Sequence, residues 1–203
     1  MISGPRAGAP VCNLIPVRLL IFCLGAVVNQ AAFAQLPQPD KSLPASEKWE
    51  SARDGLWVQL AQLRNDQVKA FLVGRGVPLE SAQPFASACV FATVLRNASS
   101  RGPITYDVRD WRINVPDMAP RSIKTREEWM KASSPGELTQ AARMGFEWSQ
   151  LPTTQTLEQE DSMQGMTAYE LPPGSRFDLL FSWSTAGRIH HGKIQGVSCA
   201  QAD

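Results

Sequence analysis

The side chains best suited to bind a metal lie in the last quarter of this sequence. Its two histidines, His190 and His191, are adjacent. Met163 and Met166 flank a Gln-Gly pair at a spacing that exported copper carriers use, and soft thioether sulfur favours Cu(I). One predicted function is therefore copper binding through Met163, Met166 and one histidine. Adjacent residues on a strand point to opposite faces, so both histidines could bind one ion only beside a bulge.

The same residues also have an ordinary structural interpretation. Polar residues such as His190 and His191 are typical of the exposed positions of a hairpin. Flexible methionines such as Met163 and Met166 commonly fill loops and cores. The sequence alone leaves both interpretations open.

Acidic side chains offer a second kind of chemistry. Glu158, Glu160 and Asp161 form a small cluster whose carboxylates could bind calcium or act in general acid–base catalysis. A hydrolase would need a pocket that gathers His190 or His191 with Glu158 or Asp161. The acids do not follow the EF-hand order and no serine stands in a G-x-S-x-G motif, so a solvated loop is the simpler interpretation.

The first 34 residues have the composition of a secretory signal peptide. Arg6 and Arg18 precede an uncharged apolar run at residues 19–28, and residues 32–34 supply the small-x-small pattern that signal peptidase reads. The run is about half the length that a transmembrane helix needs, so we expect cleavage after Ala34 and no anchor in the mature chain. The predicted location is the periplasm or the extracellular space.

Export would leave two of the four cysteines, Cys89 and Cys199. Thiols oxidise in such compartments, so this even pair predicts one disulfide between them. The alternative, two free thiols in a redox or metal site, lacks the usual C-x-x-C spacing.

The overall composition excludes some partners. With 20 basic and 19 acidic residues, the chain has no long-range field to attract nucleic acid. A hydrophobic share of 43% is enough for a packed core.

Hydrophobic spacing predicts which elements position these residues. Proline-rich residues 35–45 suggest a flexible tether, and residues 46–87 a helical segment packed on a sheet. Within it, apolar residues at steps of three and four predict a first helix with Ser46 as N-cap. The residues that define its stripe are Trp49, Ala52, Leu56, Leu60 and Leu63. A second helix is expected at residues 66–73, before Gly74 and Gly76, and a short third one after Pro78.

From Cys89 the period changes to two. Residues 89–95 are apolar on both faces and predict a central strand, on which residues 104–108 would pair back. Capping-box patterns at residues 125–128 and 134–137 predict two short inserted helices. Further strands are expected at the segments 111–115, 144–148, 166–171, 177–183 and 189–199.

Short strands without regular β-α alternation indicate an α+β fold. We expect residues 88–203 to form a mainly antiparallel β-sandwich, immunoglobulin-like or similar. The function favoured on these grounds is an exported, non-catalytic binding or accessory domain that needs no cofactor. Its partner would be an unknown protein or small ligand, and Trp57, beside the apolar stripe, is the aromatic residue most open to it. Copper handling and hydrolysis are the alternatives.

Overall fold

The computed structural model describes residues 47–99, 101–133 and 138–201. The predicted signal peptide, its cleavage site, the tether at residues 35–45, the N-cap Ser46 and the capping box at residues 134–137 lie outside the described residues. Within the part of the chain that the structure describes, no helix has the length and apolar character needed to cross a membrane.

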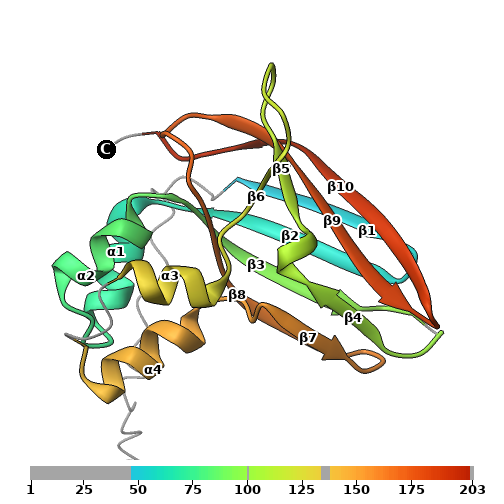
Figure 1. The fold of residues 1–203 in the computed structure, drawn as a ribbon, viewed down its shortest axis with the longest axis horizontal. Coiled ribbons are helices and arrows are strands. Elements are labelled where there is room, and N and C mark those ends of the chain that lie inside the picture. The colour runs from blue at the N-terminus through green and yellow to red at the C-terminus, as the bar shows by residue number, and fades with distance from the viewer. Residues whose placement is uncertain (1–46, 100, 134–137, 202–203) are drawn as a thin grey trace, which may run out of the picture. The chain divides into compact units, whose positions relative to one another are not determined.

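Ten strands of the described residues form two antiparallel sheets (Figure 1). The first sheet has the order β1-β2-β3-β8. Its strands are β1 (Lys48–Arg53), β2 (Leu56–Leu63), β3 (Cys89–Asn97) and β8 (Ser162–Tyr169). In the second sheet, β10 pairs with one edge of β9, while β4 and β5 share the other edge; β7 extends β4 and β6 extends β5. Its strands are β4 (Ile104–Asp107), β5 (Arg112–Asn114), β6 (Arg121–Ser122), β7 (Thr154–Leu157), β9 (Arg176–Thr185) and β10 (Arg188–Ser198).

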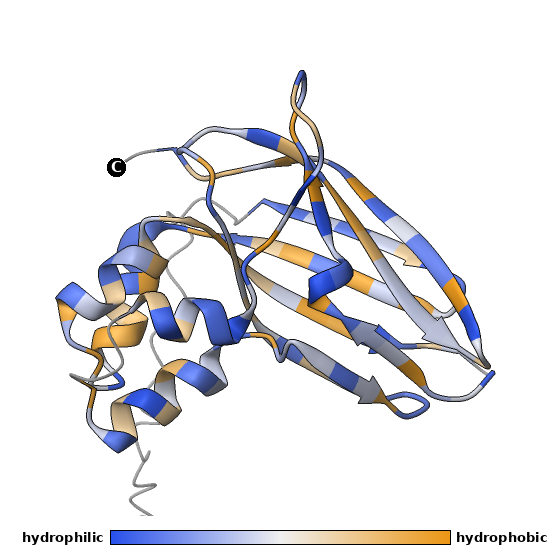
Figure 2. Ribbon diagram, viewed as in Figure 1, coloured by the Kyte–Doolittle hydropathy of each residue, from blue (hydrophilic) through white to orange (hydrophobic). Residues whose placement is uncertain are grey.

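One hydrophobic core lies between the two sheets. Buried side chains from both sheets belong to it, and along β2 and β9 hydrophobic residues alternate with more polar ones (Figure 2). At its centre the ring of Phe91 on β3 lies 6.1 Å from that of Phe177 on β9 and 5.7 Å from that of Tyr169 on β8. The sheets therefore pack face to face, and the predicted α+β class with a mainly antiparallel sheet architecture is confirmed.

In the described part of the chain, four short helices gather at one end of the sheets (Figure 1). They are α1 (Asn65–Val73), α2 (Leu79–Ala86), α3 (Arg126–Ala132) and α4 (Gln140–Ser149), and a 3-10 turn spans Val108–Asp110. The rings of Trp129 and Phe146 each lie 5.3 Å from that of Phe85 on α2. These side chains form a second core with Val90 and Met166, which alternate along β3 and β8 with residues of the first core. The helices therefore cover the outer face of the first sheet at this end.

A disulfide joins the two sheets beside the helices. Cys89 opens β3 in the first sheet, and Cys199 directly follows β10 in the second. Their Cα atoms lie 5.2 Å apart and the sulfurs are bonded, as the count of cysteines predicts.

The helix predicted from Ser46 to Leu63 is wrong for the described residues, which form the hairpin β1–β2. Steps of four, such as Leu56 to Leu60, fit a period of two as well as a helix. In the hairpin Leu56, Val58 and Leu60 are buried on one face. Asp54 and Gly55, with φ angles of 47° and 89°, make the tight turn, and an Asp-Gly pair is the usual sequence for such a turn. The predicted helical segment is thus helical only from Asn65.

The strand predicted at residues 144–148 is also wrong, because these residues belong to α4. Thr139 caps this helix by accepting a hydrogen bond from the backbone N–H of Ala142 at 3.2 Å. Phe146 packs inward, whereas Met144 and Trp148 lie exposed one turn apart. Apolar residues at every second position, which predicted a strand, are here one buried residue between two exposed ones on a helix.

The predicted pairing of residues 104–108 with β3 is wrong as well. β4 pairs with β7 and β9 in the second sheet, because both edges of β3 are taken by β2 and β8. The position of β3 inside its sheet is confirmed. Helices α1 and α2 and the capping box of Thr125 with Glu128 are also found where the sequence predicts them.

Candidate functional site

The two predicted methionine ligands lie on opposite faces of β8. Met163 packs against the core between the sheets, while Met166 is buried in the second core beneath the helices. They are three positions apart, an odd number, so their side chains must point to different sides of the strand.

The two histidines also point to opposite faces, here of β10. His190 pairs with Trp183, and their rings stack with centroids 5.6 Å apart. His191 pairs with Ser182 on the other face and is exposed. The irregularity in the pairing of β10 lies between Ile194 and Val197, away from both histidines. No bulge therefore re-aims one histidine toward the other.

The structure does not gather the predicted copper ligands into one coordination sphere. β10, which carries both histidines, lies beside β1, whereas Met163 is on β8 at the opposite edge of the first sheet. The row of paired residues across this sheet runs from Met163 through Leu95 and Val58 to Ser51 on β1. Three strand spacings thus place Met163 about 14 Å from β1. Among residues 47–99, 101–133 and 138–201, no three His, Cys, Asp or Glu side chains form a group that could hold a metal ion.

The carboxylate beside His190 is not one of the acids that the hydrolase hypothesis requires. It belongs to Asp54, whose Oδ2 lies 3.5 Å from Nδ1 of His190. Glu158 and Asp161 instead hold the turn between β7 and β8, where Oδ2 of Asp161 accepts a hydrogen bond from the backbone N–H of Glu158. Glu160 pairs with Arg96. The histidine and acidic residues therefore do not form the predicted constellation.

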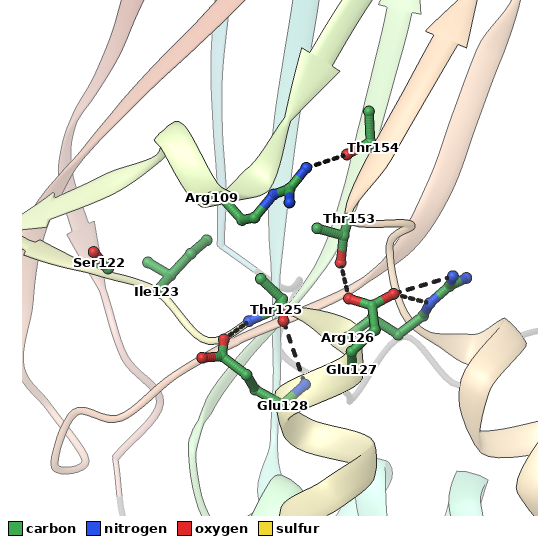
Figure 3. Close-up of a pocket in the computed structure, with 9 residues that line it drawn as sticks. All are labelled: Arg109, Ser122, Ile123, Thr125, Arg126, Glu127, Glu128, Thr153 and Thr154. Atoms are coloured by element: carbon green, nitrogen blue, oxygen red, sulfur yellow. Dashed lines mark hydrogen bonds and ion pairs between the residues drawn. The ribbon is translucent and has the colours of Figure 1, made fainter.

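A polar cleft of about 690 Å³ lies beside the N-terminus of α3 (Figure 3). Glu127 accepts a hydrogen bond from the hydroxyl of Thr153 and pairs with Arg126, which also lies 3.7 Å from Glu147. Burial raises the pKa of Glu127, but these hydrogen bonds and the charge of Arg126 outweigh it and lower the pKa below its usual value. Glu127 is therefore a well-stabilised carboxylate and a poor general base.

The other charges of the polar cleft are also paired internally. Arg109 binds Asp107 through its Nε and Nη2 atoms, which holds the pKa of Asp107 below its usual value. Glu128 and Thr125 complete the capping box of α3, as Figure 3 shows. This network stabilises the junction between α3 and the second sheet and leaves little charge to recognise a ligand.

A second cleft, of about 500 Å³, has a mostly apolar lining and is here named the α1–α4 groove. Its floor is the outer face of the first sheet, where Ala92 on β3 and Met166 on β8 are directly paired. One wall is α1 and the other is α4. The lining residues are Leu63, Gln67, Val68, Phe71, Arg75, Ala92, Gly145, Trp148, Ser149, Gln164, Gly165 and Met166.

The wall formed by α4 is fixed to the sheet at its C-terminal end. Gln150 makes a parallel bridge with Met166, and the backbone N–H of Leu151 donates to the Met166 carbonyl at 2.9 Å. A side chain at Gly165 would strike the backbone of Leu151, since its Cβ would lie 2.4 Å from that nitrogen. Glycine at this position therefore allows the end of α4, with Trp148, to lie directly beside β8.

Exposed apolar side chains gather at the rim of the groove. Trp148 is 72% exposed, and Phe71 on the opposite wall is 38% exposed. Met144, which is outside the lining, lies one turn before Trp148 and is also 38% exposed. Trp57, which the sequence favoured as the aromatic open to a partner, is half-buried on the outer face of the first sheet, opposite Arg96. An apolar cleft with an exposed tryptophan at its edge is typical of a ligand site.

Sequence reasoning missed this groove because its parts lie far apart along the chain. The available signal was the run of helix-forming residues after Thr139, which, treated as a helix, places Met144 and Trp148 on one exposed face.

Comparison of the chain with protein-family models, with curated proteins and with solved structures found no match.

Proposed function

We propose that this chain is an exported, non-catalytic binding protein that holds an apolar small ligand in the α1–α4 groove. The observation that carries the proposal is an apolar cleft of about 500 Å³ whose rim keeps Phe71 and Trp148 exposed. This volume lies within the range of about 300–1,000 Å³ that small-molecule sites occupy. Burying the exposed rings against a ligand would gain about 25 cal/mol per Å² of apolar surface.

Export and cleavage after Ala34, with a periplasmic or secreted location, belong to the same proposal. The disulfide between Cys89 and Cys199 supports an oxidising compartment, because such bonds persist there and are rare in the cytosol. The immunoglobulin-like character suggested by the sequence stays a prediction within the observed pair of antiparallel sheets.

A neutral fluorescent probe tests the groove directly. N-phenyl-1-naphthylamine brightens in apolar surroundings, and we expect its fluorescence to rise saturably with one probe per protein. Ala92→Phe would fill the floor, since the Ala92 side chain lines the groove, and should weaken binding at least about tenfold. Ala52→Phe is the matched control, because Ala52 is an exposed residue of β1 outside the lining.

Trp148→Ala provides a second variant with little effect on folding, because the side chain is largely exposed. We expect it to weaken probe binding several-fold while the thermal unfolding midpoint stays within about 2 °C. Saturable binding that is equal in the wild type, Ala92→Phe and Trp148→Ala proteins would exclude the groove, as would no binding at all.

A further inference from the structure

The α1–α4 groove carries charge of one sign only among its described lining residues. Among the described residues that line it, Arg75 is the only ionisable one. The groove therefore presents a single positive charge and no negative charge of its own to an occupant.

Arg75 follows α1 and lies close to both walls of the groove. Its guanidinium carbon lies 3.4 Å from the centroid of the Phe71 ring, and its Nη1 donates to the Phe71 carbonyl at 3.3 Å. A Cβ at Gly145 on α4 would lie 3.3 Å from the Cβ of Arg75, so the arginine stem passes close against α4 at the position where side-chain bulk is absent. The head group is thus placed beside the aromatic rim and not extended freely into solvent.

Arg75 has no carboxylate partner among the described side chains, in contrast to the arginines of the polar cleft. Arg109 is paired with Asp107, and Arg126 with Glu127 and Glu147. Arg75 contacts the Phe71 ring and the Phe71 carbonyl, which occupy one face and one nitrogen of its guanidinium. Its remaining N–H donors are in the geometry that binds a carboxylate by two parallel hydrogen bonds.

We propose that the ligand of the α1–α4 groove is a single-chain amphiphile with a carboxylate head group, its apolar chain on the floor between α1 and α4 and its carboxylate at Arg75. This inference rests on the proposed function of the groove. The apolar lining accepts the chain, and the lone cation selects the sign of the head group. A cationic amphiphile would place a second positive charge beside Arg75. A neutral amphiphile would leave the N–H donors of Arg75 bound to water.

Competition against N-phenyl-1-naphthylamine tests the sign of the charge. The competitors are decanoate, decan-1-ol and decyltrimethylammonium, which share a chain and differ in the head group. We expect decanoate to displace the probe at about a fivefold lower concentration than decan-1-ol, the size expected for an ion pair at the surface, and decyltrimethylammonium to be the weakest. Raising the salt to about 1 M should reduce this preference, because it screens exposed charges.

Arg75→Gln separates the two proposals. With competitor concentrations scaled to the affinity of this variant for the neutral probe, decanoate and decan-1-ol should displace the probe equally well. Arg188→Gln, at the first residue of β10 and outside the lining, is the matched control and should keep the preference for decanoate. If the probe binds in the groove but all three competitors act alike on the wild type, the head-group inference is wrong and the groove stands. If Ala92→Phe does not affect the probe, the groove itself is wrong.

Discussion

Removal of the disulfide should cost a large part of the stability of the fold. Cys89 and Cys199 are separated by 110 residues, so their bond closes a loop that contains most of both sheets. Chain entropy gives about 4–5 kcal/mol for a loop of this length. Because single domains are stable by only about 5–15 kcal/mol, Cys89→Ala combined with Cys199→Ala should bring the protein near its folding threshold.

Urea unfolding, followed by far-UV circular dichroism, measures this effect. With a slope of about 2 kcal/mol per molar, the midpoint should fall by about 2 M. Alanine is the appropriate replacement, since both cysteines are buried and a serine hydroxyl would need a new partner. Wild-type protein in excess reductant should give the same midpoint as the double variant. A midpoint within about 0.5 M of the oxidised wild type in both samples would refute the loop-closure argument.

Three further predictions concern other parts of the molecule. Asn97→Ala should destabilise the protein by about 2–3 kcal/mol in thermal unfolding, because the buried Asn97 amide donates to the carbonyls of Gly102 and Leu157, both at 3.0 Å; an unchanged midpoint would contradict this. The pKa of Asp107 is lowered in the fold by its hydrogen bonds from Arg109, so its contribution to stability is present above its unfolded pKa of about 3.9 and is lost as the pH falls below that value. Asp107→Asn should therefore make the free energy of unfolding less dependent on pH between about 5 and 3, and equal slopes for both proteins would argue against it. Titration of the purified protein with Cu(I) against a competing chelator should reveal no site tighter than micromolar, since the predicted ligands lie apart; a tighter site would restore the copper hypothesis.

Features that depend on local pattern could be predicted from the sequence. The apolar run from Cys89 gives β3, and the Thr125–Glu128 spacing gives the cap of α3. The pairing of Cys89 with Cys199 follows from the number of cysteines that export would leave. In each case the information lies within a few residues or in a simple count.

The errors arise where two periods fit the same residues. Leu56 and Leu60 are compatible with both a helix and a strand, and only the turn at Asp54 and Gly55 decides between them. In α4 a helix was mistaken for a strand. Phe146 is buried between the exposed Met144 and Trp148, so apolar residues stand at every second position, as they do in a strand. The spacing of apolar residues alone does not distinguish a helix from a strand in such segments, and the turn and cap residues beside them are needed as well.

The groove could not be predicted from local pattern at all. Phe71, Ala92, Trp148 and Met166 come from four different elements, and their approach depends on the packing of α1 and α4 on the first sheet. The polar candidates, in contrast, were visible as residue types but are separated by the alternation of side chains along β8 and β10. Residue chemistry identified candidates, and tertiary packing decided which of them lie together.

The most direct test of the binding site is to locate a ligand by NMR. In a titration of the ¹⁵N-labelled protein with decanoate, we predict that the largest shifts fall on the backbone amides of Gly145 and Gly165, the side-chain amides of Gln67 and Gln164, and the indole N–H of Trp148. All five residues line the α1–α4 groove. Shifts confined to the polar cleft around Glu127, or none at saturating decanoate, would contradict the account.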